Sequence, residues 1–381
     1  MKFSVASFLR SIRLDDSDPD KQPSYEGKDP RLQEVPCCAT CHSRPAAKLL
    51  MCCSRCKTAW YCSKECQTAD YESSHKSLCV SIARTLKQVQ QRTVPLRSTI
   101  IDVFLEPQNF FESQVGLFGQ FYQAQEYMTA RRHLVELYVQ AANIVETKSV
   151  WEKALSHALE LMRLDYRDVI ETRYVIPFIL LNLNRDDDAF DFIRYWMKID
   201  LNDRSKLFDL MNRHFESREG EWIYPRNQNC RFRDVFEECA NVNDRKAPLA
   251  FLVALLIIKC RIVATYDATC GSMDLAFGTT SGQRIQEVQS TVKELILDGA
   301  LVNIQSQRQQ VERLLNVIQR RNAIILPAFL NPTPLLAKKW QNAPNEALLV
   351  LLHGTGCFVR VPGAKAMLEE RFGKEPSYNL G

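Results

Sequence analysis

The sequence lacks a hydrophobic run of the length that a membrane-spanning helix needs. Such a helix takes about 20 consecutive apolar residues, whereas the longest run here, residues 249–258, ends after ten residues at Lys259. We therefore expect a buried core helix at this place and no transmembrane segment. The first residues also lack the apolar stretch of a secretory leader, and the sequence turns acidic at Asp15. We expect no signal peptide.

A concentrated charge of one sign is also missing. The net charge is +4 over 381 residues, and residues 37–79 hold six basic and three acidic side chains. Binding to nucleic-acid phosphates usually takes a denser stripe of lysine and arginine. Nucleic-acid binding is therefore the weaker alternative function. It would depend on Arg44, Lys48, Arg55, Lys57, Lys64 and Lys76.

Motifs of catalysis are absent as well. His353-Gly354-Thr355-Gly356 resembles an oxyanion or phosphate loop, but the sequence has no G-x-S-x-G elbow and no Walker lysine follows these glycines. We expect a glycine-capped helix end that leads into a short strand over residues 357–361. No catalytic triad or paired carboxylates can be argued elsewhere. We therefore expect that the protein is not an enzyme and has no catalytic or cofactor-binding residues.

Cysteine, in contrast, is abundant in one place. Nine of the fourteen cysteines lie within residues 37–79. Eight residues there form four close pairs, namely Cys38 with Cys41, Cys53 with Cys56, Cys62 with Cys66, and His75 with Cys79. Two such pairs complete one tetrahedral zinc site, so eight ligands predict two structural zinc ions. A disulfide framework is the alternative, but it would need an oxidising compartment; reduced thiolates indicate cytoplasm or nucleus.

The finer pattern resembles the MYND zinc finger. From Cys53 to Cys79 the sequence reads CSRCKTAWYCSKECQTADYESSHKSLC, which has the family's Tyr-Cys before the third pair and its Gln after Cys66. The family usually has Trp in place of Tyr71, and two residues rather than three between that aromatic and His75. The resemblance implies a cross-braced finger. One zinc would be bound by Cys38, Cys41, Cys62 and Cys66, and the other by Cys53, Cys56, His75 and Cys79.

The resemblance also implies a function. MYND fingers bind short proline-containing peptides of partner proteins, chiefly in transcriptional regulation, and the peptide-contacting positions here would be Ser54, Gln67 and Tyr71. An alternative role for Tyr71 is to pack the finger onto its own helical domain. MYND fingers also occur in SET-type lysine methyltransferases, but residues 226–230 match that family's Asn-His-x-Cys-x-Pro-Asn motif poorly. An interaction adaptor is therefore the favoured function.

The other cysteines and His42 are not expected to bind metal. Cys37 and Cys52 each precede a proposed ligand, and only Cys38 and Cys53 keep the tight C-x2-C spacing. His42 is expected to face solvent. The scattered cysteines, expected to be buried apolar fillers, are Cys230, Cys239, Cys260, Cys270 and Cys357. A finger of about forty residues buries too little apolar surface to fold alone, so we expect it to unfold without metal.

Composition divides the chain into four parts. Residues 1–36 read as a flexible N-terminal segment, 37–80 as the finger, 81–215 as a helical region similar to tetratricopeptide (TPR) repeats, and 216–381 as a helical C-terminal region. The expected fold is thus a small cross-braced two-zinc finger followed by a mainly α-helical domain of TPR-like hairpins. Apolar residues at helical spacing after Cys79 predict that the last finger helix extends into this domain.

The helical part is read from apolar periodicity. The TPR comparison rests on two segments that recur with an offset of about 34 residues, 157–165 and 191–200; an irregular helical bundle is the alternative. Pro177 lies inside a predicted helix and is expected to kink it. Residues 331–344 are expected to form a break. The predicted helices cover residues 131–145, 151–162, 174–183, 189–197, 283–298, 311–321 and 346–352.

Overall fold

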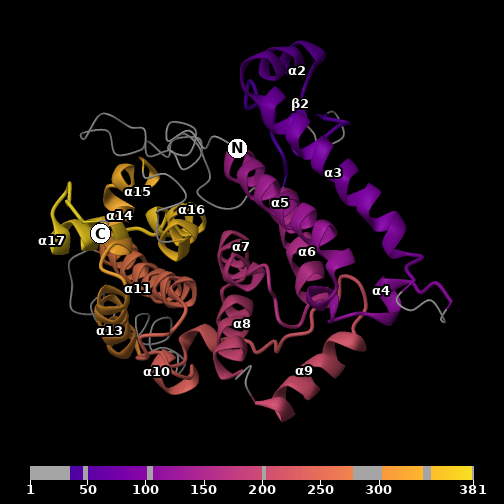
Figure 1. Cartoon of the computed structure of the whole chain (residues 1–381). Helices are drawn as coiled ribbons and strands as arrows, with labels where there is room; N and C mark the ends of the chain where they lie inside the picture. The colour runs from indigo at the N-terminus through magenta and orange to yellow at the C-terminus, as the bar shows by residue number, and fades with distance from the viewer. Residues whose placement is uncertain are drawn as a thin grey trace. The chain divides into compact units, whose positions relative to one another are not determined.

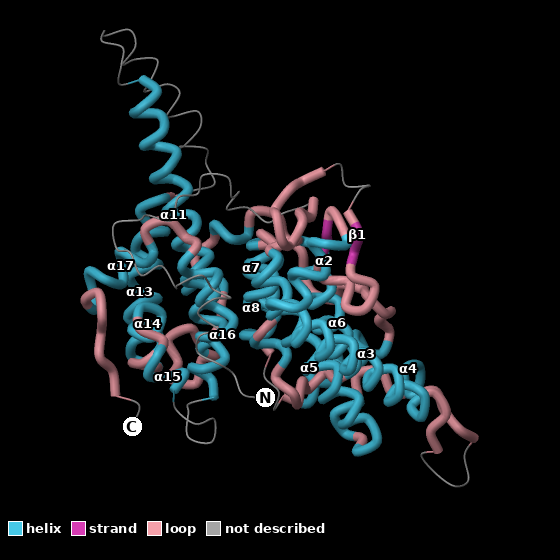
Figure 2. Tube along the Cα trace, turned by 90° about the horizontal axis from the view of Figure 1, so that it is seen from above, coloured by secondary structure: helices cyan, strands magenta, loops and turns pink. Residues whose placement is uncertain are grey.

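The structure is a computed structural model, and it describes residues 35–45, 50–100, 106–199, 203–277, 303–337 and 345–379. The predictions for residues 1–34 and for a helix over 283–298 lie outside this part. Helices dominate the described residues, with one two-stranded sheet (Figures 1 and 2). The chain forms two compact units. Unit 1 comprises residues 1–184 and 199–223, and unit 2 comprises residues 185–198 and 224–381.

The described part of unit 1 begins with the cysteine-rich segment. Strands β1 (Met51–Cys52) and β2 (Trp60–Tyr61) pair antiparallel, with Met51 opposite Tyr61. Helix α2 (Lys64–Asp70) follows, and the Ser63 side chain caps it by accepting from the Cys66 N–H. A π-helical turn (Tyr71–His75) joins α2 directly to α3 (Lys76–Leu96). The helix that carries Cys79 therefore continues well beyond the cysteine-rich segment, as predicted.

The rest of unit 1 packs around α5 (Tyr122–Val145). Helix α3 lies along α5, and α6 (Lys148–Leu164) packs on α5 as well, as Figure 1 shows. The predicted apolar stripes are buried here, with Leu134, Tyr138 and Trp151 among the core side chains. Three shorter elements complete the described part of this unit's body: α4 (Phe110–Ser113), the 3-10 turn Phe118–Gln120, and α9 (Arg204–Phe215), which contacts α6.

The prediction of a kink at Pro177 is wrong. The 3-10 turn Thr172–Tyr174 ends before it, and helix α7 (Ile176–Asn182) begins one residue ahead of the proline. Pro177 therefore lies in the first turn, where a backbone N–H has no intrahelical partner and its absence costs nothing. The proline therefore starts this helix and interrupts no helix before it.

A close contact between Gly119 and Asp165 carries a stability prediction. A methyl group on Gly119 would lie 2.6–2.8 Å from the buried Asp165 carboxyl group. That carboxyl holds the turn after α6 by accepting from the N–H groups of Arg167 (3.2 Å) and Val169 (2.8 Å). Gly119→Ala should destabilise unit 1 by about 1–3 kcal/mol, because the turn or the carboxyl must move.

Urea denaturation of the purified variant measures this effect. Gly271→Ala is the control, since a methyl group there meets no atom within 4 Å and the residue is helical. The control should be neutral or slightly stabilising. A Gly119→Ala midpoint equal to that of the control would contradict the prediction.

Unit 2 is built around α11 (Leu249–Phe277). Residues 249–258 are fully buried or nearly so, which confirms the predicted core helix. Helices α13 (Ile304–Arg321), α16 (Asn345–Val359) and α8 (Asp186–Lys198) pack against it. The unit also contains the 3-10 turn Cys230–Phe232, α10 (Val235–Glu238), α14 (Ile325–Leu330), α15 (Thr333–Ala337) and α17 (Ala364–Phe372).

Lys259, which ends the apolar run, is itself fully buried. Its ammonium group donates to the carbonyl oxygens of Arg231 (2.8 Å) and Arg233 (2.6 Å) and to Oε1 of Gln307 (2.8 Å). It also lies 5.5 Å from the ring centroid of Phe190. Burial lowers the pKa of Lys259 to about 8. The lysine thus fastens segment 231–233 to the central helix of this unit.

The acidic face of α8 holds residues 227–231, which overlap this segment. The Asp191 carboxyl, which is fully buried, accepts from the backbone and side-chain N–H groups of Asn227 at 2.6 and 2.9 Å. Asp187 accepts from the Arg231 N–H at 3.0 Å and pairs with its guanidinium at 2.7 Å. Because these acids bind backbone groups, they fix a segment that has little regular structure.

The prediction of a strand over residues 357–361 is wrong. Helix α16 runs through Gly354 and Gly356 to Val359. Cys357 and Phe358 are buried, and the Phe358 ring stacks on Phe329 with centroids 5.0 Å apart. Tertiary packing therefore outweighs the low helix propensity of two glycines. The predicted break over residues 331–344 is interrupted by α15.

A TPR-like array is not confirmed. The two segments that recur at an offset of about 34 residues lie in α6 and α8, which belong to different units. The domain boundaries drawn from composition stay a prediction. The prediction that the scattered cysteines are buried agrees with the structure for Cys230, Cys239, Cys260 and Cys357. Cys270 is half-buried.

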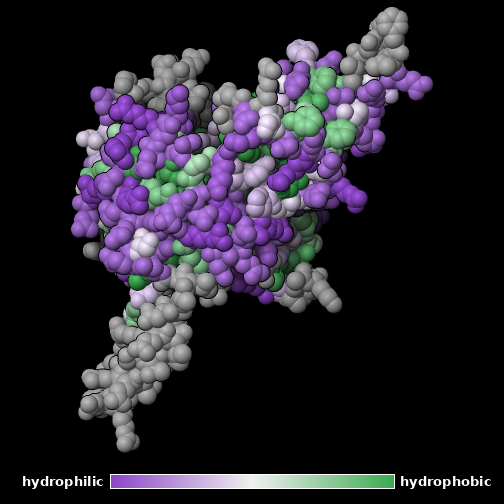
Figure 3. Space-filling model, turned by 90° about the horizontal axis from the view of Figure 1, so that it is seen from below, coloured by the Kyte–Doolittle hydropathy of each residue, from purple (hydrophilic) through white to green (hydrophobic). Residues whose placement is uncertain are grey.

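Among the described residues, one helix is long and apolar enough to cross a membrane. By length and composition, Leu249–Gly271 of α11 could cross a bilayer, and α16 and α17, bent by 118°, pass the same test only as a pair. In α11, 72% of the most apolar window is buried inside the protein. There is no clear transmembrane span among these residues. On the face drawn in Figure 3, hydrophilic residues predominate and hydrophobic ones lie in separate patches.

Candidate metal centre

Two tight turns with the same backbone geometry present the first two cysteine pairs. In each, the residue after the second cysteine is left-handed, with φ of 56° at His42 and 55° at Lys57. Its N–H donates to the carbonyl of the first cysteine, His42 to Cys38 at 3.0 Å and Lys57 to Cys53 at 2.9 Å. This closed turn places both sulfurs of a C-x2-C pair on the same side. The predicted knuckles are therefore present.

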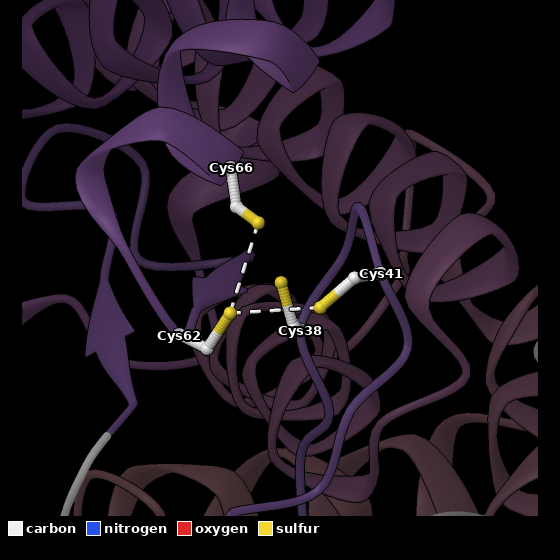
Figure 4. A group of neighbouring side chains, drawn as sticks. All are labelled: Cys38, Cys41, Cys62 and Cys66. Carbon is white, nitrogen blue, oxygen red and sulfur yellow. Dashed lines mark hydrogen bonds between the residues drawn. The ribbon is translucent and has the colours of Figure 1, made fainter.

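The first cluster joins the first and third cysteine pairs. Cys38, Cys41, Cys62 and Cys66 all have their sulfur atoms within 4.8 Å of one another. The Cys41 and Cys62 sulfurs are 3.5 Å apart, and those of Cys62 and Cys66 are 3.7 Å apart. Figure 4 shows the four side chains pointing toward a common centre, Cys66 from a helix and the others from loops.

The second cluster joins the second and fourth pairs. The ligand atoms of Cys53, Cys56, His75 and Cys79 lie within 4.8 Å of one another. The Cys53 and Cys79 sulfurs are 3.8 Å apart, and Nε2 of His75 lies 3.4 Å from the Cys56 sulfur. The two clusters are cross-braced, as the resemblance implied, because each takes one pair from a knuckle and one from a later segment.

These distances fit zinc. A tetrahedral ion about 2.3 Å from each sulfur and about 2.0–2.1 Å from an imidazole nitrogen places sulfurs about 3.8 Å apart, and sulfur and nitrogen about 3.6 Å apart. All fourteen cysteines are free, and a disulfide would need sulfurs about 2.05 Å apart. The two clusters are thus compatible with two zinc ions and not with the disulfide alternative. Each supplies four protein ligands, which is typical of structural rather than catalytic zinc.

The π-helical turn explains the unusual spacing before His75. Three residues separate Tyr71 from His75, one more than is usual in MYND fingers. A π turn accommodates one additional residue within a helix, and the turn here covers Tyr71–His75. Nε2 of His75 therefore still reaches the Cys56 sulfur, and the departure in spacing does not remove His75 from the cluster.

Hydrogen bonds favour the thiolate form of one cysteine in each cluster. Burial opposes ionisation of Cys38, but hydrogen bonds from the N–H groups of Cys41, Cys62 and Thr40 outweigh it and lower its pKa to about 6. Burial likewise opposes ionisation of Cys56, and its bonds with His75 and Thr58 lower its pKa to about 6. The Thr58 hydroxyl donates to the Cys56 sulfur at 3.2 Å. Thiolates are the form that binds zinc.

The residues excluded as ligands lie outside both clusters. Neither Cys37 nor Cys52 joins one, and burial raises the pKa of the Cys37 thiol, which favours its neutral form. His42 is exposed.

The three positions assigned to peptide contact lie on the finger's helical and knuckle segments. Ser54 is exposed in the second knuckle, and Gln67 and Tyr71 are four residues apart along the helix, so they share a face. The Tyr71 hydroxyl accepts from the Arg55 guanidinium at 3.1 Å, and its ring lies edge-on to His75. These contacts of Tyr71 are all within the finger. Whether the three residues contact a peptide stays a prediction.

The packing of the finger on α5 and α6 was not visible in the sequence. Lys153 of α6 donates a hydrogen bond to the Lys57 carbonyl oxygen. A cavity of about 230 Å³ remains between the finger and the end of α5, with Trp60, Asp70, Leu78, Ile144 and Glu146 among its lining residues. No local spacing relates these residues, since they meet only through the packing of α3 on α5.

Comparison with known proteins agrees with the geometry. The family model of the MYND finger matches residues 38–79. No curated protein and no solved structure matches the chain significantly. Residues 38–79 are therefore a MYND finger, and MYND fingers are generally non-enzymatic modules of protein–protein interaction. The helical remainder has no counterpart in these comparisons.

Proposed function

We propose that this MYND-finger protein is a non-enzymatic adaptor that binds short proline-containing peptides of partner proteins through its finger, in transcriptional regulation. Cys38, Cys41, Cys62 and Cys66 bind one structural zinc ion, and Cys53, Cys56, His75 and Cys79 bind the other. The proposal is carried by one observation, the cross-braced pair of clusters within a segment that matches the MYND family. The zinc ions stabilise the fold of the finger, and the surface of the finger binds the peptide.

The peptide surface is proposed to comprise Ser54, Gln67 and Tyr71. An aromatic side chain gives proline rings a flat apolar contact, and a glutamine amide can both donate to and accept from a peptide backbone. The hydrogen bond from Arg55 holds the Tyr71 ring in place. Among the described residues β1 pairs only with β2, and Met51 is 43% exposed. The outer edge of β1 is therefore available to an extended peptide.

Substitution of Gln67 tests this surface. Gln67→Ala should weaken binding of a peptide that contains Pro-Leu-Pro by about tenfold, because the peptide loses its hydrogen bonds to the amide. Isothermal titration calorimetry of the zinc-loaded protein measures the affinity and should give a 1:1 ratio for the wild type. Metal analysis should show an unchanged zinc content, since the Gln67 side chain lies outside both clusters.

The matched control is Gln91→Ala, which removes an exposed glutamine from α3 beyond the finger. It should leave the affinity unchanged. Equal affinity of wild type and Gln67→Ala would refute the assignment of Gln67. Absence of binding to any proline-containing peptide by the zinc-loaded wild type would refute the proposed function itself.

A further inference from the structure

Helix α3 carries a local excess of positive charge that the net charge of the whole chain does not reveal. Between Glu72 and Asp102 the sequence has no aspartate or glutamate. The basic side chains of the same stretch are Lys76, Arg84, Lys87, Arg92 and Arg97. Surface helices usually mix both signs, because opposite charges three or four residues apart stabilise a helix. Helix α3 lacks this stabilisation.

One face of α3 is buried, and the opposite face is basic. The buried face includes Ile82 and Val89, and α3 packs on α5. Since a helix turns by about 100° per residue, Arg84 and Lys87 lie on the side away from these two residues. Both basic side chains are exposed. The helix therefore presents two neighbouring cations to solvent.

These cations have no acidic partner in the described part of the chain. Lys76, Arg84 and Lys87, here called the basic row, form no ion pair with a described carboxylate. Glu72, one turn before Lys76, is exposed and forms no ion pair with the row. Arg84 and Lys87 are three residues apart, so their like charges repel each other at a cost to the helix. An acidic group of a partner would relieve this repulsion.

The basic row continues the surface proposed for proline-containing peptides. Tyr71 begins the π turn, and the i→i+5 bonds of such a turn place Lys76 one turn further along. Val80, Arg84 and Lys87 follow at spacings of four, four and three residues, which makes one row on a helix. Arg84 lies thirteen residues beyond Tyr71, or about 20 Å at about 1.5 Å per residue. An extended peptide covers this distance with about six residues.

The composition of this face favours a peptide over a nucleic acid. A DNA-binding surface commonly contacts about six to ten phosphates, whereas the basic row has three cations. Val80 is half-exposed within the row, and Val94, on the same side of α3, is 70% exposed. Apolar side chains beside cations suit a peptide, because its own side chains are both apolar and charged.

We propose that the basic row binds an acidic segment of the same partner peptide whose proline-containing motif binds the finger. This assignment, which rests on the proposed function, adds a requirement for aspartate or glutamate about six residues from the prolines. Exposed ion pairs are weak one by one, but a segment tethered to a bound motif meets Arg84 and Lys87 at a high effective concentration. The row thus selects among proline-containing partners.

Calorimetric titration of the zinc-loaded full chain with matched peptides tests the proposal. Each peptide contains Pro-Leu-Pro, with a run of glutamates or of glutamines about six residues before it or after it. One of the two glutamate peptides should bind about fivefold more tightly than its glutamine counterpart, and the gain should shrink as the salt concentration rises. Equal affinities of glutamate and glutamine peptides in both arrangements would overturn this inference and leave the proline site intact. Absence of binding by every peptide would refute both proposals.

Variants assign the gain to α3. The double substitution Arg84→Gln with Lys87→Gln should remove most of the preference for glutamate, and Arg84→Glu with Lys87→Glu should transfer the preference to a lysine-flanked peptide. Both double variants should bind the glutamine peptide as the wild type does, since the finger is unchanged. A preference for glutamate that survives both double substitutions would refute the role of the row.

The matched control is Arg92→Gln. Arg92 is an exposed arginine of the same helix, but Glu126 of α5 already pairs with it at 2.7 Å. This variant should keep the preference for glutamate, and loss of the preference would contradict the assignment to the basic row.

A short DNA duplex tests the other class of occupant. It should compete only weakly with the glutamate peptide, because few phosphates can contact the row. A duplex that binds more tightly than the peptide, and that no longer binds after Arg84→Gln with Lys87→Gln, would make the row a nucleic-acid site and overturn the inference.

Discussion

Replacing Cys56 with serine is expected to release zinc from the second cluster and to unfold the finger. A serine hydroxyl stays protonated at neutral pH and is a poor zinc ligand, while each structural zinc contributes on the order of 10–16 kcal/mol to the folding of a finger peptide. The free energy lost exceeds what the small apolar core of the finger can supply. Metal analysis should show a fall from two zinc ions per chain to one or none.

Hydrogen exchange measured by mass spectrometry locates the loss. Amides of residues 50–80 should exchange rapidly in Cys56→Ser, whereas those of α11 should stay protected, because α11 lies in the other unit. Far-ultraviolet circular dichroism should fall only slightly, since most helices lie outside the finger. The effect should extend into the start of α3, where Cys79 and Ile82 are buried.

Cys52→Ser is the matched control for this experiment. Cys52 is an exposed cysteine of the same finger that belongs to neither cluster, so its substitution should leave two zinc ions bound. Cys37→Ser should behave in the same way. Loss of metal from Cys52→Ser, or retention of both ions by Cys56→Ser, would contradict the assignment of ligands.

Replacing Lys259 with methionine is expected to destabilise unit 2 by about 3 kcal/mol. Methionine fills a similar volume but leaves the part-buried carbonyls of Arg231 and Arg233 and the buried Gln307 amide oxygen without their donor. Each buried acceptor left unpaired costs about 1–3 kcal/mol, and relief from burying a charge offsets part of the sum. Exchange of the most protected amides of α11 measures the change.

The effect of Lys259→Met should depend on pH. The pKa of Lys259 is lowered to about 8 in the folded protein and is about 10.4 in an unfolded chain. Between these values the unfolded chain binds more protons, so the contribution of Lys259 to stability increases as the pH rises. The destabilisation by Lys259→Met should therefore be larger at pH 10 than at pH 7.

Lys365→Met serves as the control, because Lys365 is an exposed lysine of α17 in the same unit. It should change stability by less than about 0.5 kcal/mol at either pH. A Lys259→Met protein as stable as this control would show that the three hydrogen bonds contribute nothing net. A cost that falls between pH 7 and pH 10 would contradict the direction of the pKa shift.

The metal centre was predictable because the two ligands of each pair lie within a few residues of one another in the sequence. The C-x2-C and C-x3-C spacings follow from what one turn can present to an ion, and they are readable without a structure. The partners of each pair came from the family resemblance. The contacts around Trp60 and Glu146 were not predictable, because these residues are 86 positions apart and meet only when α3 packs on α5.

The helical character of the region after the finger was predictable from the sequence, but the bounds of individual helices were less so. Apolar periodicity located α5 and α6, and an uninterrupted apolar run located α11, where residues 249–258 are all buried. It failed at Gly354 and Gly356, where burial of neighbouring side chains overrides weak propensity, and at Pro177, where the helix starts rather than bends. It also could not foresee that Lys259 remains inside the core, because its three acceptors lie at least 26 residues away in sequence.

The π turn between α2 and α3 sets the angular offset between the two metal clusters. Cys66 of the first cluster precedes the turn, and His75 and Cys79 of the second end it or follow it. Deleting one residue here would rotate everything beyond it by about 100° about the helix axis. Cys79 would then face away from Cys53, and α3 would present a different side to α5. One residue of this turn thus allows the finger to bind both zinc ions and to pack on α5 at the same time.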